Sequence, residues 1–298
     1  MRIFLTGGSG YIGTAVLDAF VRAGHQVDAL VRNSEKAAAV QARGGHAVFG
    51  DLSEPATYAD AAAAADGVVH TAFEYSPRGV KVDEGALGAF LIPAKQPWRF
   101  VIYTSGIWVL GHCPSPTDET ATLNPIELVR WRPAHEQQVL NAATAGIRTI
   151  VIRPGVVYGG SRGMVGDIFK DAANSLVRVI GSGENHWPLV YDRDAGELYA
   201  RIVNTPTASG VYHANDEGDE IVNDIVAALG DHAHTQPSIR HVPLPEARKK
   251  MGPYADALAL DQRVRSTRSR ALGWAPTLHS VAGNVARLFE EWKRGKAA

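Results

Sequence analysis

The sequence has little cysteine, no long apolar run and no excess of charge of one sign. Its 298 residues include one cysteine, Cys113, so no disulfide can form within the chain and a reducing compartment, the cytoplasm, is expected. No run of 18 apolar residues occurs, and Met1 leads directly into a strand-like segment, so we expect neither a membrane span nor a signal peptide. The formal net charge of -1 offers no basic surplus for nucleic acid or an anionic membrane.

Patterns of metal ligands are also missing. His232 and His234 have no cysteine or carboxylate spaced with them as in a zinc site, so we predict a polar loop there and no metal. Cys113 stands between two turn-forming neighbours, Gly111-His112 and Pro114, and is predicted to lie in a loop without a nucleophilic role. Hydrophobic residues make up 45% of the chain, which is enough for one large α/β domain, with or without a small appendage.

The strongest motif lies in the first 13 residues, MRIFLTGGSGYIG. The apolar run from Ile3 to Leu5 has no polar alternation, which is typical of a strand buried on both faces of a parallel sheet. Glycines follow at three-residue spacing, and apolar residues then recur at helical spacing. In a strand, glycine turn and helix, the N–H groups at the helix start can hold a pyrophosphate. The cofactor contacts predicted here are Gly7, Ser9, Gly10, Tyr11, Ile12 and Gly13.

Strands and helices alternate through the first half of the chain, which indicates a Rossmann-type, doubly wound parallel sheet of the α/β class. The alternation stops after Pro154. We therefore predict a dinucleotide-binding domain over 1–160 and a smaller substrate-binding lobe over 161–298, with segments that return to the first domain. Ser34 is predicted to cap the second helix. Predicted strands after the first are 26–31, 46–49, 68–72, 100–105 and 148–152, and predicted helices after the first are 35–43, 53–65, 78–91 and 126–145.

The motifs and their order resemble the extended short-chain dehydrogenase/reductase family, also called the epimerase/dehydratase family. TGGSGYIG is similar to its nucleotide fingerprint, and Gly50-Asp51-Leu52 is similar to its adenine-side turn. Tyr103-Thr104-Ser105-Gly106 is similar to its active-site strand, and the segment 153–159, RPGVVYG, to the one that walls the nicotinamide. The C-terminal GWAP at 273–276 is similar to its GWxP. The resemblance implies a nicotinamide cofactor with further contacts at Asp51, Leu52, Thr71, Ala72, Pro154, Gly155, Val156 and Val157.

Cofactor choice depends on Arg32 and Asn33, which follow the second predicted strand. In this fold an acidic residue there holds the ribose 2′-OH of NAD, whereas an arginine accommodates the 2′-phosphate of NADP. Val31 stands where the resemblance places the acid, and the competing Asp28 lies inside the strand. A charged hydrogen bond contributes ~1.5–3 kcal/mol, or about ten- to a hundredfold in favour of NADP.

One departure from the family concerns its catalytic tyrosine and lysine, which are spaced YxxxK. Counting back from Glu136 puts Arg132 at the lysine position and Leu128 at the tyrosine position. Leucine has no proton to give, so the resemblance is to an atypical subgroup without the usual acid. Candidates for a substitute acid are Tyr158, Tyr191 and His186.

Three residues are the predicted catalytic set. Ser105 ends a central strand, where ligands bind in open α/β sheets, and its hydroxyl would polarise a substrate carbonyl. Thr104 could do the same, and the family's serine often stands one position later, at Gly106. Arg132 would keep positive charge near the site, but it would not shuttle a proton because a guanidinium stays protonated in proteins.

The leading interpretation is an NADP(H)-dependent oxidoreductase acting on a small organic carbonyl or alcohol, with NAD as the alternative cofactor. Two other functions stay open: a nucleotide-sugar epimerase or dehydratase, and a cofactor-binding regulator without turnover. The expected partner is a small-molecule substrate. The helices near 77–91 and 126–145 correspond to the usual dimer faces of the family, which is compatible with a homodimer.

Overall fold

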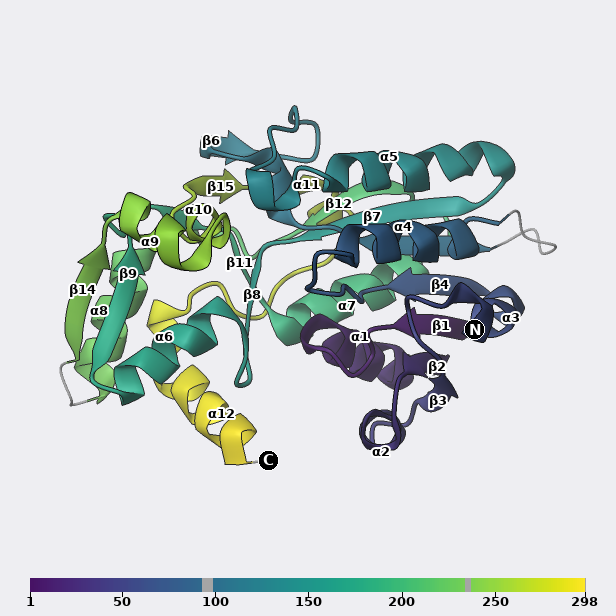
Figure 1. Cartoon of the computed structure of the whole chain (residues 1–298), viewed down its shortest axis with the longest axis horizontal. Coiled ribbons are helices and arrows are strands. Elements are labelled where there is room, and N and C mark those ends of the chain that lie inside the picture. The colour runs from purple at the N-terminus through teal and green to yellow at the C-terminus, as the bar shows by residue number, and fades with distance from the viewer. Residues whose placement is uncertain (93–98, 234–236, 298) are drawn as a thin grey trace. The chain divides into compact units, whose positions relative to one another are not determined.

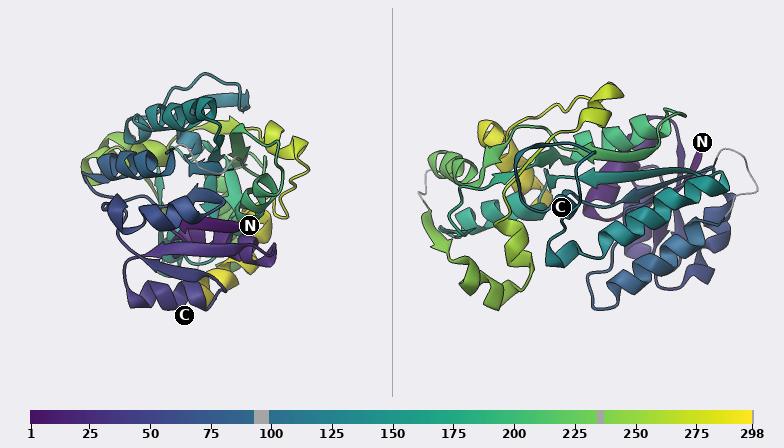
Figure 2. Two further views of the ribbon diagram at one scale, coloured as in Figure 1. Left: turned by 90° about the vertical axis from the view of Figure 1, so that its right-hand side faces the viewer. Right: turned by 90° about the horizontal axis from the view of Figure 1, so that it is seen from above.

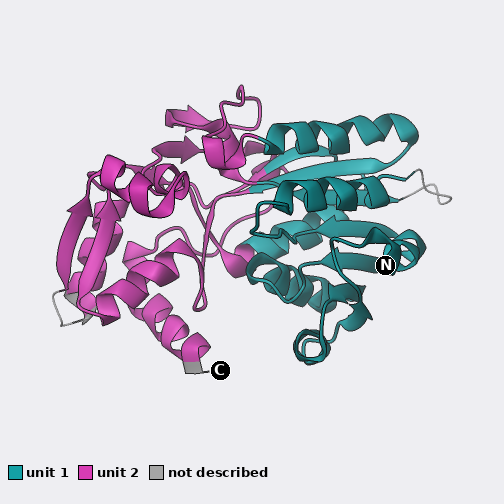
Figure 3. Ribbon diagram, in the orientation of Figure 1, with its two compact units in different colours: residues 1–105, 131–153, 195–212 teal, residues 106–130, 154–194, 213–298 magenta. Residues whose placement is uncertain are grey.

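The computed structural model describes residues 1–92, 99–233 and 237–297 (Figure 1). These residues form two compact units (Figure 3). Unit 1 contains residues 1–105, 131–153 and 195–212, and unit 2 contains residues 106–130, 154–194 and 213–298. Unit 1 thus includes the segment 195–212 from beyond residue 160, and unit 2 includes the segment 106–130 from before it. No helix in the described part of the chain is long and apolar enough to cross a membrane.

A seven-stranded sheet forms the centre of unit 1, in the order β12-β7-β5-β4-β1-β2-β3. Neighbouring strands from β7 to β3 are parallel. The strand order reverses between β1 and β4. In such sheets ligands bind at the carboxyl ends of the two strands at this point. The predicted Rossmann-type α/β class is confirmed. The strands are β1 (Arg2–Thr6), β2 (Gln26–Val31), β3 (His46–Phe49), β4 (Gly67–His70), β5 (Phe100–Thr104), β7 (Arg148–Pro154) and β12 (Gly210–Ala214).

Helices cover both faces of this sheet. On one face α1 meets α7, since a Cβ on Gly196 would lie 2.4 Å from the Ala15 carbonyl oxygen and Arg22 pairs with Glu197. On the other face α3 and α4 bury Tyr58 and Phe90 against the strands, and α4 packs beside α5 (Figure 2). The helices are α1 (Tyr11–Arg22), α2 (Ser34–Gln41), α3 (Ala59–Ala64), α4 (Gly79–Phe90), α5 (Arg132–Asn141) and α7 (Asp192–Val203).

Two predicted helices differ from the structure for local reasons. Asn33, not Ser34, caps α2: its side-chain oxygen accepts a 3.0 Å hydrogen bond from the Lys36 N–H. The predicted helix 126–145 is interrupted and consists of η3 (Glu127–Val129), α5 and η4 (Ala142–Ala145). Pro133 is the reason, because proline lacks an N–H and is tolerated only in the first turn of a helix.

Unit 2 combines four two-stranded sheets with helices around its own core. Two predictions change here. Cys113 lies in a strand and not in a loop, and His232 lies in a helix, whereas His234 lies outside the described residues. The paired strands are β6 (Cys113–Thr117) with β15 (Gln262–Val264), β8 (Val156–Tyr158) with β11 (Leu189–Tyr191), β9 (Leu176–Ile180) with β14 (Ser238–Val242), and β10 (His186–Trp187) with β13 (Glu220–Ile221). The helices are α6 (Gly163–Ala173), α8 (Val222–Ala233), α9 (Leu244–Met251), α10 (Tyr254–Leu258), α11 (Thr267–Ala271) and α12 (Val285–Ala297).

Candidate functional site

The glycine turn after β1 is closed by backbone contacts that leave no room for side chains. Gly7 has a φ of 75°, and its carbonyl oxygen accepts a 2.7 Å hydrogen bond from the Gly10 N–H. A Cβ on Gly13 would lie 1.9 Å from that oxygen. Gly10 is the N-cap of α1 and offers no side chain to the first-turn N–H groups. The turn therefore has the cradle and the uncapped helix start that a pyrophosphate requires.

The end of β4 lies against this turn. The Thr71 hydroxyl donates to the Thr6 carbonyl oxygen at 2.7 Å, and the Ala72 N–H donates to the Thr6 hydroxyl at 3.3 Å. A Cβ on Gly7 would lie 2.7 Å from the Thr71 oxygen. The structure thus brings the predicted residues of β1 and β4 together. Half-buried side chains at the same turn are Ser9, Tyr11 and Ile12.

An exposed positive charge follows β2. Arg32 is exposed, and no described residue forms a salt bridge with it. Asp28 is buried lower in the strand and accepts a 2.5 Å hydrogen bond from the Arg2 Nε. The Asp51 carboxylate accepts from both the N–H and the hydroxyl of Ser53, and these bonds lower its pKa. Asp28 is therefore paired with Arg2, whereas Asp51 is hydrogen-bonded to Ser53 and its pKa is lowered further by the charge of Arg32. The guanidinium of Arg32 itself forms no salt bridge with a described residue, so it can meet a phosphate.

A buried carboxylate that the sequence analysis missed lies under this edge of the sheet. Asp83 of α4 is 2% exposed and receives three hydrogen bonds. His135 Nδ1 lies 2.7 Å and the Tyr103 hydroxyl 2.9 Å from its Oδ2, and His70 Nε2 lies 3.1 Å from its Oδ1. Burial raises the pKa of Asp83, but the hydrogen bonds from His135 and His70 outweigh it and hold the pKa well below the ordinary value.

These contacts continue toward the glycine turn. The Thr6 hydroxyl lies 2.6 Å from His70 Nδ1. An ionised Asp83 can only accept, so His70 Nε2–H donates to it, and Nδ1 of the neutral ring then accepts from the Thr6 hydroxyl. At the other end the Arg132 Nη1 donates to the Tyr103 oxygen at 3.3 Å. One chain of buried hydrogen bonds therefore joins the loop after β4 to the first residue of α5.

The end of β5 contains the predicted catalytic residues. Thr104 is occupied: its hydroxyl lies 2.8 Å from that of Tyr199, which is fully buried. Ser105 is 7% exposed, and its Oγ has no hydrogen-bond partner among the described residues. The Ser105 N–H donates to Ile152 at 2.8 Å, which fixes the backbone. A buried hydroxyl without a partner is costly and marks a place where a ligand atom or water would bind.

Arg132 reaches the same strand end. Its Nη1 donates to the Thr104 carbonyl oxygen at 3.1 Å, and its guanidinium stacks over the Trp131 and Phe73 rings at 4.5 and 5.3 Å from their centroids. The Nε and Nη2 groups have no acceptor in the described part of the chain. Arg132 can therefore still donate toward an oxygen at this edge. Behind it, Glu136 forms a buried ion pair with Arg153 at 2.5 Å.

The candidates for a substitute acid are engaged elsewhere. His186 lies in β10, where Nδ1 is 2.7 Å from Asp261 and Nε2 is 3.0 Å from Arg263, so both ring nitrogens are used. The Tyr158 hydroxyl donates to Asp216 and the Tyr191 hydroxyl to Glu291. Burial raises the pKa of Tyr191 to about 12 and that of Tyr158 further. All four contacts are within unit 2.

Leu128 and Arg132 do not share a helix. Leu128 lies in η3, whereas Arg132 is the first residue of α5. The i, i+4 relation that places a tyrosine beside a lysine therefore does not hold at these two positions.

The predicted nicotinamide wall belongs to unit 2. The Gly155 N–H donates to Ala214 at 2.9 Å, and the Val156 N–H donates to Pro188 at 2.7 Å. A Cβ on Gly155 would lie 2.1 Å from the Pro188 oxygen. These contacts explain the glycine at this position by packing alone. Cofactor contact by the segment 154–157 stays a prediction.

Two signals could have revealed the missed residues. Asp83 stands among the apolar residues Val82, Ala86 and Leu87, and a carboxylate on the buried face of an amphipathic helix needs partners. His70 ends β4, at the edge where ligands bind. Within the described residues, no three or more histidine, cysteine, aspartate or glutamate side chains are arranged so that they could hold a metal ion.

Comparisons with known proteins give the family and the fold of the chain. A family described as NAD(P)H-binding matches residues 7–167. An uncharacterised protein of Schizosaccharomyces pombe is 31% identical over 295 residues, covering 96% of this chain and 98% of that protein. The 2-alkyl-3-oxoalkanoate reductase of Stenotrophomonas maltophilia is 25% identical over 265 residues, covering 77% and 76%. A dTDP-glucose 4,6-dehydratase from Streptomyces venezuelae, solved with NAD bound, has a TM-score of 0.83 at 19% identity and covers 100% of this chain and 98% of its own.

Proposed function

Because the chain belongs to the NAD(P)H-binding family, we propose that it is an NADPH-dependent oxidoreductase that reduces a small organic carbonyl or oxidises the corresponding alcohol. The observation that carries this proposal is the buried Ser105 hydroxyl at the end of β5, without a partner among the described residues. The bound cofactor would supply or accept the hydride. The chain itself would bind the cofactor, select NADPH and polarise the reacting oxygen.

Selection of NADPH is supported by charge. A ribose 2′-phosphate adds negative charge that NADH lacks, and Arg32 is a planar, exposed guanidinium without a salt-bridge partner in the described ranges. Asp28, the acid closest to it along β2, is neutralised by Arg2 and stands three residues before the strand end. The glycine turn would hold the pyrophosphate common to both cofactors.

Polarisation of the substrate would come from Ser105. Hydride addition to a carbonyl builds negative charge on oxygen, and a preorganised donor at that oxygen lowers the barrier. The Ser105 hydroxyl would donate to it, because no other described group takes its proton. Arg132 would add positive charge through its remaining N–H groups. The Tyr103 and Asp83 side chains would hold Arg132 in place from below.

The named relatives favour carbonyl reduction over epimerisation. The Stenotrophomonas relative is named as a reductase of a 3-oxo acid and shares 25% identity over most of both chains, whereas the sugar dehydratase shares 19%. A reductase of an oxo compound requires one polarised oxygen and one hydride. The site around Ser105 offers that donor.

The test is a screen for NADPH oxidation over aldehydes, ketones and 3-oxo acids, followed at the cofactor's absorbance. On a substrate found this way, Ser105→Ala should lower kcat by roughly 10²-fold or more, as for loss of an oxyanion donor. Thr104→Val is the matched control and should lower kcat by less than tenfold, because its hydroxyl is bonded to Tyr199.

Two outcomes would contradict the proposal. One is tight NADPH binding by calorimetry together with no turnover of any carbonyl or alcohol, which would favour a cofactor-binding regulator. The other is full activity in Ser105→Ala with loss of activity in Thr104→Val, which would transfer the polarising role to the Thr104–Tyr199 pair.

A further inference from the structure

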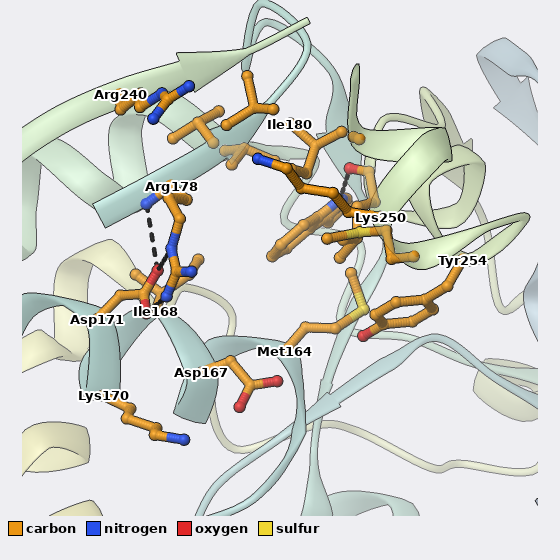
Figure 4. Close-up of a pocket in the computed structure, with 17 residues that line it drawn as sticks. Met164, Asp167, Ile168, Lys170, Asp171, Arg178, Ile180, Arg240, Lys250 and Tyr254 are labelled. Carbon is orange, nitrogen blue, oxygen red and sulfur yellow. Dashed lines mark hydrogen bonds and ion pairs between the residues drawn. The ribbon is translucent and has the colours of Figure 1, made fainter. Parts of the chain in front are cut away.

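Unit 2 contains a cavity that is lined only by described residues of unit 2 itself. It has a volume of about 330 Å³, within the range of small-molecule sites, and is bounded by α6, β9, β14, α9 and α10. Of the 17 described residues that line it, eleven are apolar or aromatic and six are charged. Every one belongs to unit 2, whereas the glycine turn, Ser105 and Arg132 belong to unit 1. Figure 4 shows the lining side chains.

The floor of the cavity is apolar and buried. Met164 and Ile168 of α6 are 7% and 8% exposed, and Trp187 is 4% exposed. The only polar atom of Trp187, its Nε1–H, already donates to the Leu258 carbonyl oxygen at 3.1 Å. Tyr254 of α10 adds an aromatic face. Apart from the Tyr254 hydroxyl, these four side chains offer no polar group for the edges of a sugar or a base, so the floor favours an aliphatic chain.

The rim has a surplus of positive charge. Arg240 and Lys250 both donate to the same oxygen of Glu246, at 3.2 and 2.9 Å, so two cations share one carboxylate. Their side chains are 57% and 66% exposed, which places the charges at the water-facing edge. Arg178 is fully paired, since its guanidinium binds both oxygens of Asp171 (Figure 4).

We propose that this cavity binds an amphipathic carboxylate: an aliphatic chain on the apolar floor, with its anionic end at Arg240 and Lys250. Asp167, which lines the cavity from α6, would repel a second anionic group and limits the ligand to one. The proposal goes beyond the reductase function, because binding here requires neither cofactor nor turnover.

The chain provides an unusual internal probe. It contains three methionines, of which Met164 and Met251 line the cavity and Met1 is the exposed first residue. With ¹³C-methyl methionine labelling of the full chain, and without NADPH, decanoate should shift the Met164 and Met251 signals and leave Met1 unchanged. Met164→Leu and Met251→Leu assign the signals.

The length of the ligand's aliphatic chain tests whether that chain lies on the apolar floor. Each buried methylene contributes about 0.8 kcal/mol, or about fourfold in affinity, so decanoate should bind about 15-fold tighter than octanoate. Ala247→Leu places added volume in the cavity from α9 and should weaken decanoate by at least tenfold. The melting temperature of Ala247→Leu is measured first to confirm that the variant folds. The comparison of octanoate with decanoate uses the wild-type protein alone.

Head-group charge tests the rim. Decylammonium should bind at least fivefold more weakly than decanoate. Lys250→Gln should weaken decanoate binding two- to fivefold. Lys249 is the next residue on α9 but does not line the cavity, so Lys249→Gln should leave decanoate binding unchanged. Three results would overturn the proposal: equal shifts of all three methionines, no gain from octanoate to decanoate, or tighter binding of decylammonium or of UDP-glucose at the same methionines. If decanoate binds as expected but no carbonyl is reduced, only the reductase proposal fails.

Discussion

Replacing Asp83 by asparagine should destabilise unit 1 strongly, although the two side chains have the same shape. The carboxylate accepts hydrogen bonds from His135, Tyr103 and His70, at 2.7, 2.9 and 3.1 Å. Asparagine has one acceptor oxygen and brings an NH₂ group toward at least one of these donors. One buried unsatisfied donor costs about 1–3 kcal/mol, and the bonds that survive lose the benefit of a charged acceptor. We expect a loss of about 3 kcal/mol in the free energy of unfolding.

The assay is urea denaturation at pH 7, with Glu84→Gln as the matched control. Glu84 is the next residue on α4 and is exposed, so its substitution should change the free energy of unfolding by less than about 0.5 kcal/mol. If Asp83→Asn and Glu84→Gln had the same free energy of unfolding, the three hydrogen bonds of Asp83 would not stabilise unit 1.

The pH dependence gives an independent check. The pKa of Asp83 is lower in the folded chain than its ordinary value of 3.8. A depressed pKa adds stability above the unfolded-state value, and this stability is lost as the pH falls toward the folded-state value. The difference in unfolding free energy between wild type and Asp83→Asn should therefore narrow as the pH falls below about 4. A gap that stays the same down to pH 2.5 would show that the charge of Asp83 contributes nothing.

Three further predictions concern cofactor choice, the turn and a second buried acid. Arg32→Ala should weaken NADPH binding about ten- to a hundredfold by calorimetry and leave NADH unchanged, whereas Lys36→Ala should affect neither. Gly13→Ala places a Cβ 1.9 Å from the Gly7 carbonyl oxygen and should abolish NADPH binding. The control Gly85→Ala, with nothing within 4 Å of the added Cβ, should bind NADPH normally and raise the free energy of unfolding by ~0.5–1 kcal/mol through helix propensity. Equal NADPH affinities of the two variants would mean that the turn has no role in binding. Burial raises the pKa of Asp216 to about 7, so stability should fall between about pH 4 and 7, and Asp216→Asn should be roughly 2–4 kcal/mol more stable than wild type at pH 8; a less stable variant would contradict this sign.

Contiguous sequence predicted the cofactor turn and the fold class. Gly7, Gly10 and Gly13 fall within seven residues between an apolar strand and an amphipathic helix, so their geometry depends on short-range steric limits. The alternation of strands and helices predicted the parallel sheet for the same reason. Ser105 could also be located in advance, because the end of a buried apolar strand is visible as the end of an apolar run.

Tertiary structure alone decided which polar groups are engaged. Asp83 gathers donors from β4, β5 and α5, which are up to 52 residues away from it, and no local pattern encodes such a meeting. Packing likewise paired Thr104 with Tyr199, 95 residues apart, and left the Ser105 hydroxyl unpaired. A hydrogen bond depends on positions fixed to within about half an ångström. Sequence periodicity fixes which face a residue lies on, whereas only the assembled core sets the distances between atoms.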